Sequence, residues 1–206
     1  MNHRATAPRT PLAFLIIALS LLVGACGSGK AGDPAGGGSL AGSQVGGPFS
    51  LIDQDGRRVR DTDFNGRYRI VYFGFANCPD VCPVDLQVIS AGLRAFEAQD
   101  ATRAARVQPL FITVDPARDT PAVMKAYVAN FHPRLIGLTG SEQEIEAARK
   151  EYAVYAMKGE LREGGAYNVD HSRIVMLFGP QGEPITILPH DQGAEALAAE
   201  LDKWVR

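Results

Sequence analysis

Cysteine is scarce in this sequence. The 206 residues include three cysteines, Cys26, Cys78 and Cys82, and a single tryptophan. A structural zinc site needs four ligands, usually from further Cys or His in recognisable spacings, and this chain has no cysteine besides these three to supply them. A structural Cys78–Cys82 disulfide would enclose a very short loop, and the stabilisation from a cross-link falls as the loop shortens. Because a chain of this length buries enough core without such a bond, we expect another role for the pair.

A surplus of positive charge is also missing. The chain has 21 Lys and Arg against 23 Asp and Glu, which gives a formal net charge of −2. Loss of the N-terminal segment described next would remove two of the basic residues, Arg4 and Arg9. Phosphate binding needs an excess of Lys and Arg, so we exclude nucleic acid as a partner.

Long hydrophobic runs are absent except near the N-terminus. Residues 11–25 read PLAFLIIALSLLVGA and end directly before Cys26. This run is shorter than the about 20 apolar residues of an ordinary membrane-spanning helix and is typical of a secretory signal. Small residues followed by cysteine are similar to a lipobox, whose cysteine becomes the lipidated first residue of the mature protein.

We therefore predict a lipoprotein signal peptide over residues 1–25 and a lipid anchor at Cys26. The alternative is an uncleaved anchor helix. In both cases the rest of the chain lies outside the cytoplasm, in the periplasm or on the outer face of the cytoplasmic membrane. Residues 26–47 are rich in Gly, Ser and Ala, a composition that buries too little surface to order itself. We predict a flexible tether there and a folded domain over residues 48–206.

Strand and helix patterns alternate along this domain. The predicted elements, in chain order, are a hairpin turning at Asp55–Gly56, a strand at 68–75, a helix carrying Leu86, Ile89, Leu93 and Phe96, a strand at 107–114, a helix capped by Thr120, a strand at 134–140, a helix opened by Ser141 and Glu144, a hairpin over 173–188 and a helix over 193–205. This order predicts an α/β, thioredoxin-like fold with an N-terminal β-hairpin and an additional C-terminal hairpin and helix.

The two remaining cysteines lie where the strand at 68–75 gives way to a helix. Residues 71–86 read VYFGFANCPDVCPVDL, and Asp80 lies between Cys78 and Cys82. A helix N-terminus favours thiolate over thiol. In a helical segment, positions four apart share one face, with Cβ atoms about 5–6 Å apart. The pair could form a disulfide, act as a redox dithiol or hold one metal ion.

Thiolates are soft donors that suit Cu(I), which is satisfied with few ligands. A third donor is therefore sought among the four histidines. We interpret His132 and His190 as solvated loop residues. His171 precedes the penultimate strand, which in a thioredoxin-like sheet lies beside the cysteine-bearing strand. Asp170 could orient the His171 imidazole from behind.

Other chemistries for the same residues remain open at this point. A thiol–disulfide oxidoreductase would use Cys78 and Cys82, although the proline usual in thioredoxin reductases before the penultimate strand is replaced here by Asp170, His171 and Ser172. A Cys–His hydrolase would leave the second cysteine without a role.

Three segments together resemble the Sco/SenC family of copper-binding, membrane-tethered, thioredoxin-like proteins. They are VYFGFANCPDVCPVDL, ITVDPARDTP and VDHSRIVMLFGPQG, in that order. The resemblance implies copper, as Cu(I) or Cu(II), bound by Cys78, Cys82 and His171. It also implies delivery of copper to, or thiol reduction at, the dinuclear copper centre of cytochrome c oxidase subunit II. One departure is Asn77, where the family often has a larger residue.

The resulting prediction is a lipid-tethered, exported copper chaperone that works as a monomer, with oxidase subunit II and other copper chaperones as partners. The alternatives are a thiol–disulfide oxidoreductase that keeps the cysteines of subunit II reduced, and a redox or copper sensor. We expect Asp80 and Asp170 to support the site and leave open whether Asp115, Arg118 and Asp119 shape the site or only their loop. His171 discriminates between the readings, because a copper site uses it and a reductase does not.

Overall fold

The computed structural model describes Met1, residues 38–162, Gly164 and residues 166–206. The predicted signal peptide, the lipidation site at Cys26 and residues 26–37 of the predicted tether lie outside the described residues. Among the described residues, none of the helices is both long enough and apolar enough to span a membrane.

The domain is built on a seven-stranded sheet with the strand order β2-β1-β5-β4-β3-β8-β9. Strand β3 pairs in parallel with β4, which pairs in parallel with β5. Antiparallel strands complete both edges, with β8 and β9 beside β3 and with β1 and β2 beside β5. This is the thioredoxin-like arrangement that the sequence predicts. The strands are β1 (Ser50–Asp53), β2 (Arg58–Arg60), β3 (Tyr68–Gly74), β4 (Val107–Thr113), β5 (Ile136–Thr139), β8 (Val175–Phe178) and β9 (Pro184–Ile187).

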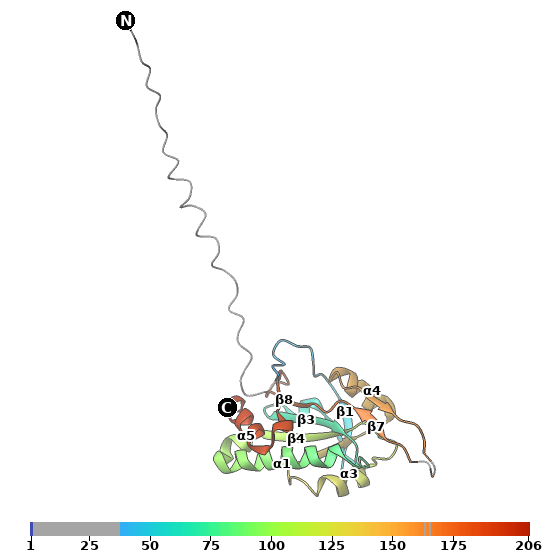
Figure 1. Ribbon diagram of the computed structural model, residues 1–206. Coiled ribbons are helices and arrows are strands. Elements are labelled where there is room, and N and C mark those ends of the chain that lie inside the picture. The colour runs from blue at the N-terminus through green and yellow to red at the C-terminus, as the bar shows by residue number, and fades with distance from the viewer. Residues whose placement is uncertain (2–37, 163, 165) are drawn as a thin grey trace. The chain divides into compact units, whose positions relative to one another are not determined.

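Helices cover both faces of this sheet. Helices α1 and α5 lie on one side and α4 on the other (Figure 1). The helical segments are η1 (Asp61–Phe64), α1 (Val81–Gln99), α2 (Ala101–Ala104), α3 (Pro121–Val128), α4 (Glu142–Glu151), η3 (His190–Gln192) and α5 (Ala194–Trp204). The predicted caps are confirmed, because the Thr120 hydroxyl accepts a hydrogen bond from Val123 N, and Ser141 and Glu144 form a capping box.

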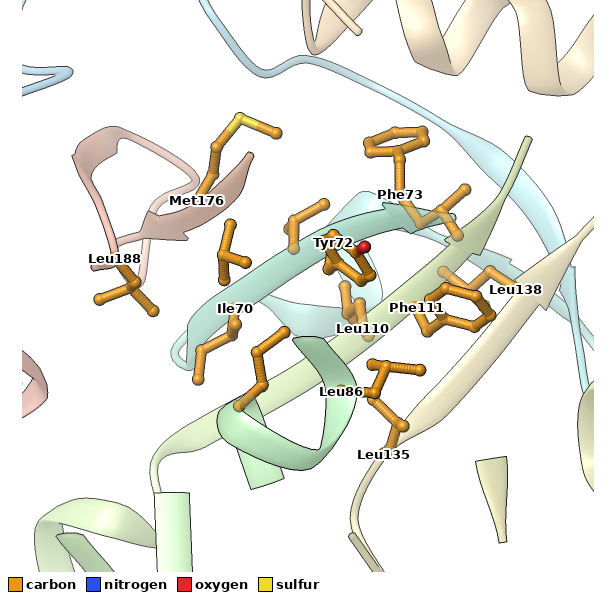
Figure 2. Packing of buried hydrophobic residues seen from close by; sticks show 14 of the residues in the cluster. Ile70, Tyr72, Phe73, Leu86, Leu110, Phe111, Leu135, Leu138, Met176 and Leu188 are labelled. Atoms are coloured by element: carbon orange, nitrogen blue, oxygen red, sulfur yellow. The ribbon is translucent and has the colours of Figure 1, made fainter. Parts of the chain in front are cut away.

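Strand β3 is buried along its whole length. Its side chains alternate between the two faces, so that Tyr72 points toward α1 and Phe73 toward the opposite side (Figure 2). The Tyr72 ring stacks on Phe111 at a centroid distance of 6.0 Å, and Phe73 packs against Tyr152 at 5.6 Å. Burial of one such aromatic side chain is worth about 1.5–3 kcal/mol. This central strand therefore gives the cysteine turn that follows it a rigid base.

The folded domain begins earlier than Pro48. Leu40 N donates to the Ile185 carbonyl at 3.0 Å, and Ile187 N donates to the Gly38 carbonyl at 2.8 Å. Residues 38–40, expected in the flexible tether, thus run along the edge strand β9, and Gly46 N donates to the Glu151 carbonyl at 2.8 Å. The composition of this segment pointed to a tether, but its backbone satisfies the free N–H and C=O groups of a sheet edge. Within the described residues, contacts with the sheet therefore begin at Gly38, ten positions before the predicted start at Pro48.

A small two-stranded sheet was not predicted. It consists of β6 (Ala156–Lys158) and β7 (Val169–His171), and its antiparallel register pairs Ala156 with His171. Strands of three residues contain too few alternations to be detected from hydrophobic periodicity. Their pairing fixes the backbone of His171 before the chain enters β8.

Candidate functional site

The cysteine turn lies between the end of β3 and the start of α1. Cys78 is in the turn and is 9% exposed, whereas Cys82 is in the first turn of α1 and is completely buried. Gly74 permits this close packing, because a Cβ atom there would lie 3.0 Å from Cys82 Sγ and 2.8 Å from the Phe111 ring. Both cysteines are free thiols in the structure, so the pair is described in its reduced state.

The two thiols are electrostatically unequal. A hydrogen bond from the Cys82 thiol lowers the pKa of Cys78 to about 3, with further help from His171 and the backbone N–H groups of Cys82 and Asp80. Cys82 N lies 3.4 Å from Cys78 Sγ. The same thiol hydrogen bond, together with burial, raises the pKa of Cys82. The reduced pair is therefore a Cys78 thiolate held by a Cys82 thiol.

His171 completes the group. Its Nε2 atom lies 3.3 Å from Cys82 Sγ, and its Nδ1 atom lies 3.0 Å from the carbonyl oxygen of Ser172. Because a carbonyl oxygen only accepts hydrogen bonds, Nδ1 carries a proton, and Nε2 is the ring atom that faces the Cys82 sulfur. The ring packs edge-on against Phe75 at a centroid distance of 5.9 Å. The three predicted donors thus come together, from the turn, from α1 and from β7.

The expected supporting carboxylates are corrected. Asp170 is exposed, and its position in β7 faces Met157 in β6. The hydrogen-bond partner of His171 Nδ1 is instead the Ser172 carbonyl, because neighbouring side chains in a strand point to opposite faces. Asp80 is also exposed, and it contributes through its backbone N–H to Cys78.

The expectation that His132 and His190 are solvated is wrong. His132 is 4% exposed, its Nε2 lies 3.4 Å from Glu97 Oε2, and its Nδ1 accepts from Arg134 N at 3.2 Å. The His190 side chain is 9% exposed, and its Nε2 lies 3.7 Å from Asp85 Oδ1. A polar ring can be buried when it has a partner elsewhere in the fold. The short polar sequence around each histidine does not reveal that partner.

The DPARDTP segment does shape the site. Asp119 is completely buried, and its Oδ2 atom accepts hydrogen bonds from Ala76 N at 3.0 Å and from the Thr113 hydroxyl at 2.6 Å. Burial raises the pKa of the Asp119 carboxyl. Arg118 forms an ion pair with Asp115 and lies over the Phe75 ring at 5.6 Å. Asp119 therefore fixes the backbone two residues before Cys78.

Sequence reasoning missed a buried carboxylate behind the cysteines. Asp85 is 2% exposed and accepts hydrogen bonds from the Tyr72 hydroxyl at 2.8 Å and from Arg173 Nη2 at 2.6 Å. A signal for it was present, because Asp85 follows Cys82 by three positions and so shares the buried face of α1 with Leu86 and Ile89. A charged residue on an apolar helix face needs a buried partner.

The group can supply two sulfur donors and one nitrogen donor, or a reactive dithiol. Within the described residues, no three Cys, His, Asp or Glu side chains already surround one point as in a ready metal site. The Cys82 thiol proton is still present, and a bound metal ion would replace it.

Known proteins share this chain's sequence and fold. The cow protein "Protein SCO2 homolog, mitochondrial" is 47% identical over 136 residues, which cover 66% of this chain and 50% of that protein. This chain spans about half the length of the first curated relatives that it matches, with 47–50% of each covered.

Two solved structures are similar to this chain in sequence and in fold. ScoI from Bradyrhizobium japonicum, solved with copper bound, is 39% identical, with a TM-score of 0.71 and coverage of 78% of this chain and 99% of that chain. ScoI from Arabidopsis thaliana, also with copper bound, is 40% identical, with a TM-score of 0.72 and coverage of 77% and 96%. The family model SCO1/SenC matches residues 38–206. This chain therefore belongs to the SCO1/SenC family.

Proposed function

We propose that this chain is a copper chaperone that binds one copper ion through Cys78, Cys82 and His171. The observation that carries the proposal is the 3.3 Å distance between Cys82 Sγ and His171 Nε2, with Cys78 Sγ beside the N-terminus of the same helix. Two family members of known structure, from Bradyrhizobium japonicum and Arabidopsis thaliana, hold copper.

The donor set fits Cu(I). Thiolate and neutral imidazole are suitable ligands for this ion, and two or three donors are enough. The Ser172 carbonyl engages His171 Nδ1, which leaves Nε2 as the ring atom available to a metal ion, and Cys78 is already a thiolate. The Cys82 thiol has to release its proton, and metal binding supplies the free energy for that release. Zinc would need a fourth ligand, and the other described histidines, His132 and His190, contact Glu97 and Asp85 instead.

Family membership supports the proposed target of delivery. The recipient is the dinuclear copper centre of cytochrome c oxidase subunit II, with other copper chaperones as sources of the metal. The protein works as a monomer. It is exported and held at the membrane by a lipid on Cys26, with the segment from residue 26 to the start of the folded domain as the tether.

A second function, thiol–disulfide reduction, is supported by the low pKa of Cys78, about 3. In this reaction the Cys78 thiolate attacks one sulfur of a target disulfide, which forms a mixed disulfide and releases the other target sulfur as thiolate. The Cys82 sulfur, after losing its proton, attacks Cys78 and releases the second target thiolate. The target gains two electrons, and Cys78–Cys82 becomes a disulfide.

An anaerobic Cu(I) titration of the reduced protein, followed by X-ray absorption, tests the main proposal. We expect binding of one Cu(I) with two sulfur neighbours and one nitrogen neighbour. A site with sulfur neighbours alone, unchanged by replacement of His171, would contradict the ligand set. Rapid reduction of a subunit II disulfide by a protein that binds no copper would favour the second function.

A further inference from the structure

Asp85 links three parts of the chain that build the candidate site. Its Oδ2 atom accepts from the Tyr72 hydroxyl of β3 at 2.8 Å and from Arg173 Nε at 3.1 Å, and its Oδ1 atom accepts from Arg173 Nη2 at 2.6 Å. The guanidinium therefore grips the carboxylate with two parallel hydrogen bonds. Such a two-point pair fixes direction as well as distance.

The Asp85–Arg173 pair lies between the two segments that carry Cys82 and His171. Asp85 lies one helical turn after Cys82 in α1, and Arg173 lies two residues after His171. The Tyr72 hydroxyl, which donates to Asp85, also hydrogen-bonds Cys82. The Asp85–Arg173 pair thus ties the segment that carries His171 to the helix that carries Cys82.

The His171 segment is held from its other side by backbone pairing. Ser172 N donates to the Tyr155 carbonyl at 3.0 Å, and Tyr155 N donates to the Ser172 hydroxyl at 3.1 Å. These bonds join the segment only to the β6 side of the small sheet. They do not fix its distance from α1. Arg173, the ring packing of His171 on Phe75 and Tyr72, and the pairing of Val175 in β8 with Tyr72 contribute to that distance.

We infer that Asp85 is a positioning residue that, through Arg173, holds the imidazole of His171 against Cys82. The inference rests on the proposed function, because it concerns how the third copper donor is placed. Arg173 bonds to Asp85 rather than to the imidazole, so the pair acts on the segment that carries His171. Its effect is to close the gap between the β7–β8 link and the first turn of α1.

The chain offers a matched control for a test. The Arg173 and Arg58 side chains are both 46% exposed, and both pair with a carboxylate, Asp85 and Glu144 respectively. Arg58 lies in β2, separated from the cysteine turn by three other strands of the sheet. We therefore compare Arg173→Gln with Arg58→Gln in the full chain. Arg173→Lys keeps the positive charge but cannot form the two parallel hydrogen bonds to Asp85.

The first measurement uses Cu(I) affinity from competition with a chelator. We expect Arg173→Gln to weaken binding on the order of 10-fold, the usual effect of losing a group that orients a ligand. Arg58→Gln should bind as the unsubstituted protein does. Arg173→Lys should resist urea as the unsubstituted protein does but should keep only part of the copper affinity. The lysine ammonium group keeps the positive charge but does not fix the direction of the pair.

The second measurement needs no copper. In a Cys78→Ala background, the rate at which iodoacetamide alkylates Cys82 reports whether the His171 segment still covers it. We expect Arg173→Gln to raise this rate several-fold and Arg58→Gln to leave it unchanged. Unchanged alkylation and unchanged affinity in Arg173→Gln would overturn the inference while leaving the copper site intact. If the unsubstituted protein bound no copper, the proposed function would fail, and the alkylation rates would still decide whether Asp85 positions the segment.

Discussion

Cys82 Sγ and His171 Nε2 lie 3.3 Å apart although 89 positions separate the two residues along the chain. One belongs to the first turn of α1 and the other ends β7. The Ser172 carbonyl engages Nδ1 of the imidazole, so Nε2 is the ring atom that faces the sulfur. Two atoms so placed can share one soft metal ion, and this pairing leads to the first predictions.

Replacement of Cys78 or Cys82 by serine should abolish tight Cu(I) binding, because a hydroxyl is a poor donor for a soft ion. The fold should persist with a loss of no more than about 1–3 kcal/mol, since serine nearly matches cysteine in size. Chelator competition and urea unfolding measure the two effects. A Cys82→Ser protein with unchanged affinity would show that the site is assigned wrongly.

Replacement of His171 by alanine separates the two candidate functions. Copper should bind more weakly and without a nitrogen neighbour, and oxidase assembly should fail in cells. Thiol exchange by Cys78 should persist, because its strongest stabilising contact is the Cys82 thiol. His132, which contacts Glu97 and Arg134 and not Asp85, serves as control, and His132→Ala should keep the nitrogen neighbour. Normal oxidase activity of His171→Ala at limiting copper, with copper binding unchanged, would remove His171 from the ligand set.

Cys78 should react as a thiolate even in acid. Because the pKa of Cys78 falls to about 3, lowering the pH from about 8 to about 5 should leave its alkylation rate nearly constant, whereas an ordinary thiol would slow steeply. Replacement of Cys82 by alanine removes the main hydrogen bond and should restore a strong pH dependence. A steep fall below pH 8 in the unsubstituted protein would contradict the thiolate–thiol description.

Asp119 should matter for stability and for its dependence on pH. Asp119→Ala leaves Ala76 N and the Thr113 hydroxyl without their acceptor, which should cost about 2–4 kcal/mol for these two buried groups. Burial raises the pKa of the folded-state carboxyl, so its contribution to stability is present in full below the unfolded value near 4 and is lost as pH rises through the raised pKa.

Asp119→Asn is the control for this dependence, since its amide oxygen can still accept but does not titrate in this range. Urea unfolding at a series of pH values should show a smaller advantage of the unsubstituted protein over Asp119→Asn as pH increases. An advantage that grows with pH would mean that the carboxyl is charged in the folded protein.

Cys26 should carry the membrane anchor. Mass spectrometry of the membrane-extracted protein should find a diacylglyceryl or triacyl adduct on Cys26, and Cys26→Ser should remain unprocessed and unlipidated. A mature protein that retains residues before Cys26 would support the uncleaved helix instead.

The sequence by itself determined the features that depend on near neighbours. The burial of β3, the position of Cys78 and Cys82 at its junction with α1, and the capping box of Ser141 all follow from residue types a few positions apart. Periodicity and capping are local properties, so the order of elements and the thioredoxin-like fold could be predicted from them.

Tertiary structure decided the contacts made across the fold. The sequence predicts His171 as the third donor, but only the tertiary structure shows that its ring contacts Cys82 and that Ser172 rather than Asp170 is the partner of that ring. The Asp85–Arg173 pair, whose members lie 88 positions apart, and the pairing of residues 38–40 along β9 are also contacts between distant segments. A buried polar group must find a partner somewhere in the fold, but the sequence does not state which distant residue will supply it.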